Sequence, residues 1–285
     1  MITWDVSPEI FKIPEFLSIG PISIRYYGVL FAVSFLAGLK IMEYIFKKEN
    51  KSDKDLNDLF LYMFAGTVIG ARLGHVLFYD PVYYLSHPLM ILEVWKGGLA
   101  SHGAAIGIPT AIYMYSKKRT DQSFLWVIDR IVIVVALAGF FIRLGNLFNS
   151  EIIGTETSLP WGFVFVNALP PQTVPRHPAQ LYESIAYLVI FFVLFTVYRK
   201  KQQNLREGFL FGIFLVAVFS FRFLVEFVKD YQEPFEQNLP LKMGQFLSIP
   251  LIILGIYILM RKKGEKQEDR KDEKNDDKKN NVITS

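Results

Sequence analysis

Seven apolar stretches of 17–21 residues follow one another along the 285-residue chain. A helix of about 20 apolar residues crosses the roughly 30 Å hydrocarbon core of a bilayer, so each stretch is long enough to be a membrane span. Inside hydrocarbon the backbone polar groups must be satisfied within the segment, which favours helices. The sequence therefore predicts an all-α integral membrane protein with seven transmembrane helices. These predicted spans are residues 28–46, 59–79, 99–115, 124–142, 181–198, 208–228 and 243–260.

The charged residues are concentrated outside these stretches. Only 20% of the residues are charged, and 16 of the charged residues lie in the tail 261–285. The small polar surface that is left favours a lipid environment over the surface of a cytosolic enzyme. We predict one membrane domain over 1–260 and a disordered cytoplasmic tail over 261–285. The formal charge of +4 leaves no basic face for nucleic acid, so no nucleic-acid partner is expected.

Basic residues are distributed unevenly among the connections. The segments 47–58, 116–123 and 199–207 contain 11 Lys and Arg in 29 residues, whereas the alternate segments contain 7 in 98 residues. Because cytoplasmic loops carry the excess of Lys and Arg, the N-terminus is predicted to lie outside, in the periplasm, and the C-terminus in the cytoplasm. The alternate segments, which are then extracytoplasmic, are residues 1–27, 80–98, 143–180 and 229–242.

Ionisable residues of the predicted spans collect at one membrane depth. Charged groups are costly in hydrocarbon, so each is a candidate for a functional site unless it reaches the interface. Arg222, for example, lies about 9 Å from the outer end of its span at 1.5 Å per residue. The full set comes from five helices and comprises Arg72, His75, His102, Arg143, Glu183, Arg222 and Glu226. This placement predicts a polar site near the outer leaflet.

Several of these residues have more than one interpretation. Arg222 and Glu226 are four residues apart, so they either form an internal ion pair or bind a ligand. His102 is either a hydrogen-bonded packing residue or a catalyst. The run from Arg143 to Glu151 offers a guanidinium, two amides and a carboxylate, which suits a phospholipid head group, although a solvated loop is also polar.

Glycines recur every fourth residue in the second and third predicted spans. Gly66, Gly70 and Gly74 share one helix face, and Gly103 and Gly107 share another. Such spacing lets membrane helices pack closely, and it also leaves room for a ligand.

The chain contains no cysteine, so a disulfide, a thiolate metal site and an enzyme-borne sulfur nucleophile are excluded. A thiol in the reaction must therefore arrive on a substrate. The four histidines have no metal-ligand spacing, and we predict neither a metal nor a cofactor. The sequence carries no signal for an oligomeric state.

An ordered set of short motifs resembles the prolipoprotein diacylglyceryl transferase family across residues 16–260. The motifs are Ala71-Arg72-Leu73-Gly74, Gly97-Gly98-Leu99 with His102-Gly103, Arg143-Leu144-Gly145-Asn146 with Asn149 and Glu151, Arg176-His177-Pro178-Ala179-Gln180-Leu181-Tyr182-Glu183, Phe221-Arg222 with Glu226-Phe227, and Met243-Gly244-Gln245. The resemblance implies a multi-pass enzyme of the bacterial inner membrane with its active site towards the periplasmic leaflet. Such an enzyme moves the sn-1,2-diacylglyceryl group of phosphatidylglycerol to the lipobox cysteine of a prolipoprotein signal peptide. The reaction forms a thioether and releases glycerol 1-phosphate.

The resemblance also implies roles for particular residues. Arg143 and Arg222 would hold the phosphate and act in catalysis, and His102 would be a catalytic base or a residue that orients substrate. The other substrate-binding residues would be Tyr27, Asn146, Glu151, Glu226 and, as a further addition, Arg72.

The chemistry fits a cationic site. A thiol with a pKa of about 8.5 must ionise before it attacks carbon, and the departing phosphate must be held while the C–O bond breaks. Cations in a low-dielectric site stabilise both anions.

Two other classes of protein are open alternatives. A transporter of an anionic substrate would need a polar path to the cytoplasmic leaflet, yet the inner halves of most spans are plain hydrocarbon. A structural scaffold would leave the clustered polar residues without a role. Incubation with phosphatidylglycerol and a cysteine peptide distinguishes both alternatives from a transferase.

Overall fold

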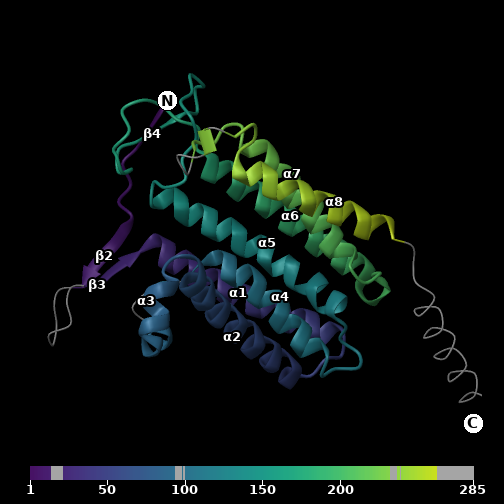
Figure 1. The fold of residues 1–285 in the computed structure, drawn as a ribbon. Helices are drawn as coiled ribbons and strands as arrows, with labels where there is room; N and C mark the ends of the chain where they lie inside the picture. The colour runs from purple at the N-terminus through teal and green to yellow at the C-terminus, as the bar shows by residue number, and fades with distance from the viewer. Residues whose placement is uncertain (14–21, 94–97, 99, 232–235, 238, 262–285) are drawn as a thin grey trace, which may run out of the picture.

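The computed structural model describes residues 1–13, 22–93, 98, 100–231, 236–237 and 239–261. Seven helices form most of this part of the chain (Figure 1): α1 (Tyr26–Lys48), α2 (Asp53–Phe78), α4 (Ser101–Ser116), α5 (Phe124–Phe148), α6 (Ala179–Lys201), α7 (Phe209–Val225) and α8 (Met243–Met260). Five of them, α1, α2, α5, α6 and α8, are long and apolar enough to cross a membrane. The shorter α4 and α7 have 16 and 17 residues. The helical architecture is confirmed, whereas the number of seven spans and the tail 262–285 stay predictions.

Two helix ends differ from the predicted spans. Ser123 caps the start of α5 by accepting a hydrogen bond from the backbone N–H of Trp126 at 3.1 Å. The helix then continues to Phe148, so Arg143 lies on a helix face and not at the start of a loop. No proline interrupts this stretch, which lets the helix extend past its most apolar part. In contrast, α7 ends at Val225, three residues before the predicted end, and is followed by turns.

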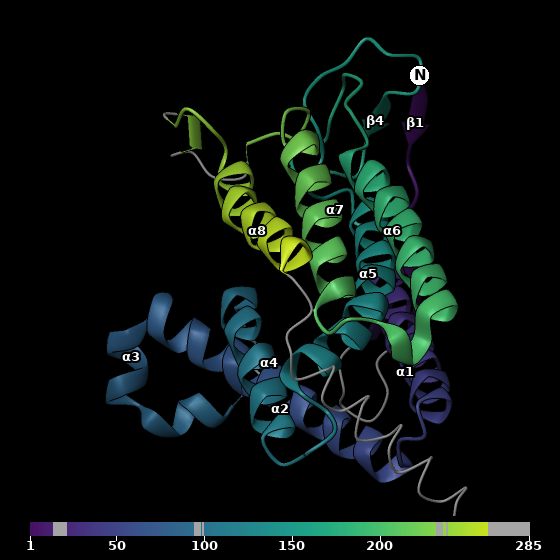
Figure 2. The same ribbon diagram turned by 90° about the vertical axis from the view of Figure 1, so that its right-hand side faces the viewer.

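The helix α5 is the centre of the bundle. It packs against α1 on one side and α6 on the other, and it also contacts α7. All of its residues from 126 to 133 are buried. The remaining helices pair at the periphery, α8 against α7 and α2 against α4 (Figures 1 and 2). The C-terminal ends of α5 and α7 and the N-terminal ends of α6 and α8 lie together, and we call this the site end of the bundle.

The predicted glycine faces bring α2 and α4 into backbone contact. A Cβ atom at Gly70 would lie 2.5 Å from the carbonyl oxygen of Gly103, and one at Gly74 would lie 2.7 Å from the Cα of Gly103. A Cβ atom at Gly66 would lie 2.7 Å from the carbonyl oxygen of Gly107. The close-packing interpretation of these glycines is confirmed, and the backbone of the partner helix fills the space that a ligand would need.

Buried charges join the helices at the end opposite the site. Asp129 accepts hydrogen bonds from the backbone N–H groups of Gly208 and Phe211, both at 2.8 Å, and so caps the start of α7 from α5. The guanidinium of Arg130 pairs with Glu49 at 2.8 Å. Asp129 and Arg130 thus join α5 to α7 and to the end of α1. Because Asp129 joins α5 to α7, it also sets where these two helices stand relative to each other at the site end.

Short strands and helices complete the described chain. The parallel pair β1 (Ile2–Trp4) and β4 (Phe163–Phe165) and the antiparallel pair β2 (Glu9–Ile13) and β3 (Ile22–Arg25) were not expected from an all-α prediction. Strands of three to five residues are too short for a clear alternation of apolar and polar positions. The remaining elements are α3 (Pro81–Ser86), η1 (Pro88–Leu92) and η3 (Gln202–Asn204). The indole of Trp4 donates to the carbonyl of Leu147 at 3.1 Å, which ties β1 to the site end.

Candidate functional site

Charged side chains from α5, α6 and the turn after α7 meet at the site end. The guanidinium Nε of Arg143 lies 3.2 Å from Oε2 of Glu183, near the start of α6. The other oxygen of Glu183 lies 3.9 Å from Nζ of Lys229, and Lys229 donates to Oε1 of Glu226 at 2.9 Å. Cations and carboxylates therefore alternate along one chain of contacts, which we call the charge ladder: Arg143, Glu183, Lys229 and Glu226.

The charge ladder is shielded from solvent. Glu183 is 0% exposed, Lys229 1% and Glu226 4%. A buried charge is costly unless it is paired, so removal of one member leaves its neighbour uncompensated. Gly244, at the start of α8, makes the room for Glu226, because a Cβ atom at this glycine would overlap the Glu226 carboxylate.

A second set of polar groups holds the other side of Arg143. Its Nη1 donates to the amide oxygen of Asn146 at 3.3 Å, and the Asn146 amide donates to Glu151 at 2.7 Å. Asn149 donates to the same Glu151 oxygen at 3.2 Å. Glu151 itself is exposed. The predicted grouping of Arg143, Asn146 and Glu151 is confirmed, and Arg143 is oriented from two sides.

Tyr27, near the start of α1, lies against the same part of α5. Its ring occupies the space beside Gly145, where a Cβ atom would lie only 2.7 Å from Cδ2 of the ring. The phenol interacts electrostatically with Glu151 and with Arg143. Tyr27 therefore lies beside Arg143 and Glu151, the residues with which the resemblance grouped it.

Arg222 is partly buried on α7, and its guanidinium has no hydrogen bond or ion pair to the part of the chain that the structure describes. Its predicted partner Glu226 is bonded to Lys229 instead, so the alternative of an internal Arg222–Glu226 pair is wrong. The phenol of Tyr187, on α6, interacts electrostatically with both Arg143 and Arg222. One guanidinium of the site is therefore anchored, and the other is available to an anion.

Arg72 and His102 lie elsewhere. Nε and Nη1 of Arg72 donate to the carbonyls of Ile91 and Gly98 at 2.8 and 3.0 Å, and its guanidinium lies 4.9 Å from the ring centroid of Tyr84. These contacts hold the segment that contains α3 and η1. His102 is exposed in the first turn of α4. No contact in the described ranges joins either residue to Arg143, and their roles in the site stay predictions.

Two residues of the site were missed by the sequence interpretation. Lys229 was counted only as a loop cation, although its position three residues after Glu226 is a usable signal. Gly154 is buried where the chain from Glu151 crosses the turn after α7. It pairs with Lys229 in an antiparallel bridge, and a Cβ atom there would lie 2.5 Å from the carbonyl oxygen of Val228 and 2.6 Å from Cβ of His177. Only glycine permits this approach.

His177 packs on the same bridge. Gly154 donates its backbone N–H to the carbonyl of His177 at 2.9 Å. Burial lowers the pKa of the His177 imidazole from its usual value of 6.5, so the ring is neutral at pH 7. A neutral ring adds no further charge next to the ladder.

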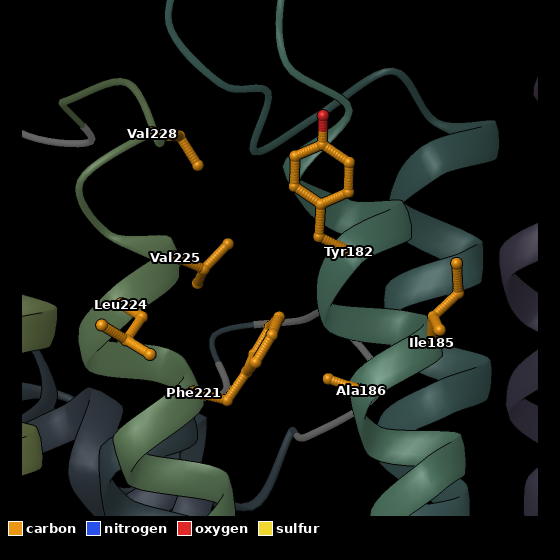
Figure 3. A pocket seen from close by; sticks show the side chains of 7 residues that line it. All are labelled: Tyr182, Ile185, Ala186, Phe221, Leu224, Val225 and Val228. Carbon is orange, nitrogen blue, oxygen red and sulfur yellow. The ribbon is translucent and has the colours of Figure 1, made fainter. Parts of the chain in front are cut away.

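An apolar groove with a volume of about 470 Å³ lies between α6 and α7 (Figure 3). Three of its residues directly precede members of the polar set in sequence: Tyr182 precedes Glu183, Phe221 precedes Arg222 and Val225 precedes Glu226. The lining residues are Tyr182, Ile185, Ala186, Phe221, Leu224, Val225 and Val228. An apolar groove between the helices that carry Glu183 and Arg222 suits the hydrocarbon part of a molecule whose anionic part binds a guanidinium. Within the ranges that the structure describes, no group of three or more His, Asp and Glu side chains is arranged to hold a metal ion.

Comparison with known proteins identifies the family. The family model described as prolipoprotein diacylglyceryl transferase matches residues 14–261. A phosphatidylglycerol–prolipoprotein diacylglyceryl transferase of Chloroherpeton thalassium is 51% identical over 94% of this chain and 97% of its own length. Proteins of the same name from Tolumonas auensis and Bacteroides fragilis are 43% and 44% identical, over 93% and 90% of this chain and 99% and 94% of their own lengths. The chain therefore belongs to the prolipoprotein diacylglyceryl transferase family.

Proposed function

We propose that this chain transfers the sn-1,2-diacylglyceryl group from phosphatidylglycerol to the lipobox cysteine thiol of prolipoproteins. The names of its relatives support this activity. Arg222 is the observation within the site that carries the proposal, because its guanidinium has no ion pair among the described residues and shares the Tyr187 phenol with the anchored Arg143. A planar guanidinium matches the oxygens of a phosphate, and the groove suits acyl chains.

The reaction is a displacement at the glycerol carbon that carries the phosphate. The thiolate sulfur forms a bond to this carbon, the C–O bond breaks, and its electron pair leaves with the phosphate oxygen. The thiol proton is taken up by a base, for which His102 is the candidate, and the products are a thioether and glycerol 1-phosphate. Arg143 and Arg222 stabilise the phosphate as charge develops on the leaving oxygen, and a water-poor site strengthens this effect.

The same proposal includes the topology. The chain crosses the bacterial inner membrane seven times, with segments 1–27, 80–98, 143–180 and 229–242 outside and the tail 261–285 in the cytoplasm. The basic connections 47–58, 116–123 and 199–207 support this orientation. The charge ladder lies at the opposite end of the bundle from these connections, which supports an active site near the periplasmic leaflet.

The purified protein, reconstituted with phosphatidylglycerol, is expected to attach a diacylglyceryl group to a lipobox peptide. Mass spectrometry of the peptide measures the thioether product, and glycerol 1-phosphate is measured in the supernatant. The matched control is the same peptide with Cys→Ser, which should stay unmodified because a serine hydroxyl ionises far less readily than a thiol. The proposal is wrong if the cysteine peptide also stays unmodified while a relative of the same family is active in the same vesicles.

His102→Asn is expected to lower the transfer rate about 100-fold, since Asn keeps hydrogen-bonding groups but cannot take up a proton near pH 7. Single-turnover transfer at saturating phosphatidylglycerol measures the chemical step. A loss of less than about tenfold would assign His102 to substrate orientation instead. His87→Asn is the control, because His87 is an exposed residue at the end of α3 with local contacts only.

A further inference from the structure

Lys229 is the most deeply buried cation of the site. It is 1% exposed, and its ammonium group contacts two carboxylates from different segments, Glu226 at 2.9 Å and Glu183 at 3.9 Å. Its backbone is held as well, through the bridge to Gly154 and through Lys242, whose ammonium donates to the carbonyls of Lys229 and Glu226. Because both its backbone and its ammonium group are held, Lys229 cannot move out of the charge ladder to bind a ligand.

The contacts of Lys229 decide which partner Glu226 takes. Residues four apart at the end of a helix lie within reach of each other, so the Glu226 carboxylate is close enough to pair with Arg222. In the structure it is turned to Lys229 instead. Glu183 is likewise shared between Lys229 and Arg143. Both buried carboxylates are thereby occupied without Arg222.

We propose that Lys229 is a positioning residue that holds Glu226 away from Arg222 and so keeps the Arg222 guanidinium free for the anionic head group of the lipid substrate. The inference rests on the proposed function. Without Lys229, the buried Glu226 carboxylate would have Arg222 and Lys242 as the cations near it. Because the Lys242 ammonium is already bonded to the carbonyls of Glu226 and Lys229, the carboxylate would pair with Arg222. The lipid phosphate would then compete with a carboxylate of this chain.

A direct test is the reactivity of Arg222 with phenylglyoxal, followed by peptide mapping of the full-length protein in phosphatidylcholine vesicles. Arg222 is expected to react in the unaltered protein and at least about fivefold more slowly in Lys229→Met, within the range of couplings between neighbouring charges. Lys229→Met with Glu226→Gln should restore the reactivity, because no carboxylate is left to pair. Equal reactivity of Arg222 in the unaltered protein and Lys229→Met would overturn the proposal.

Turnover gives a second readout from the same variants. Lys229→Met is expected to raise the KM for phosphatidylglycerol about tenfold, whereas in the Glu226→Gln background the same change should alter KM less than about twofold. Equal fold-changes in both backgrounds would show that Lys229 acts independently of Glu226 and would overturn the proposal. Lys229→Arg keeps a cation in place and is expected to resemble the unaltered protein in both readouts; a loss as large as that of Lys229→Met counts against the proposal.

Two controls separate this inference from other effects. Lys12→Met removes a lysine that also pairs with a glutamate three residues away, at 3.0 Å, but is 63% exposed, and it should change neither readout. If Lys229→Met alone does not fold, it will be absent from membranes. In that case the proposal is tested by comparing Lys229→Arg, Glu226→Gln and the double variant Lys229→Met with Glu226→Gln. If the unaltered protein transfers no lipid, the proposed function fails, while the reactivity of Arg222 still tests the role of Lys229.

Discussion

Arg143→Ala is expected to lower kcat/KM for diacylglyceryl transfer at least about 100-fold, the loss that follows removal of one group stabilising a developing oxyanion. The change removes the guanidinium that Glu183 and Asn146 orient, and it leaves the fully buried Glu183 with Lys229 alone at 3.9 Å. Initial rates with phosphatidylglycerol vesicles and a lipobox peptide measure the effect.

The matched control is Arg199→Ala. Arg199 is exposed in the last turn of α6, at the opposite end of the helix that carries Glu183, and its loss should leave the rate unchanged. Arg143→Lys keeps the charge but cannot reproduce the planar fork, so an intermediate rate is expected. If Arg143→Ala retained more than about a third of the activity with normal membrane levels, the phosphate role of Arg143 would have to be abandoned.

Gly154→Ala is expected to reduce the transfer rate about 100-fold, although it removes no charged group. The new Cβ atom would meet backbone on one side, the Val228 carbonyl at 2.5 Å, and His177 on the other at 2.6 Å. Neither neighbour is the free end of a flexible side chain, so the bridge to Lys229 must open. A displacement of about 1 Å in a catalytic site is enough for a loss of this size.

Gly28→Ala is the control for Gly154→Ala. A Cβ atom at Gly28 would have no heavy atom of the described chain within 4 Å, so normal turnover is expected. Thermal unfolding of both variants separates a folding defect from a displaced site, since overpacking costs about 1–3 kcal/mol. Wild-type activity of Gly154→Ala would show that the crossing of these two segments does not position the site.

Several predictions from the sequence agree with the structure because they depend on local spacing. The apolar stretches overlap the seven long helices, although α4 and α7 are shorter than the usual span criterion. The glycine faces of α2 and α4 meet as their four-residue spacing indicated. Arg143, Asn146 and Glu151 form hydrogen bonds because they lie within about two turns of each other at one helix end.

Contacts between distant segments could not be read from the sequence. The spacing of Arg222 and Glu226 left two alternatives, an ion pair or a ligand role, and in the structure Lys229 pairs with the Glu226 carboxylate. Arg72 was grouped with the site by depth, and this role stays a prediction; in the structure its guanidinium donates to backbone carbonyls of the segment around η1. The spacing along one helix shows which charged side chains can reach each other. It does not show which of several possible partners a carboxylate pairs with in the folded chain.

The sequence by itself determined that this chain is a helical membrane protein with a cationic site, because the length of apolar runs and the cost of charge in hydrocarbon depend on composition and order alone. Only the tertiary structure decided which cations are occupied and which is free. Lys229, Gly154 and Glu183 come from three separate segments, and their contacts form only after α5, α6 and α7 have packed. Pairing among buried charges depends on distances of a few ångströms between helices, which the order of residues along the chain does not contain.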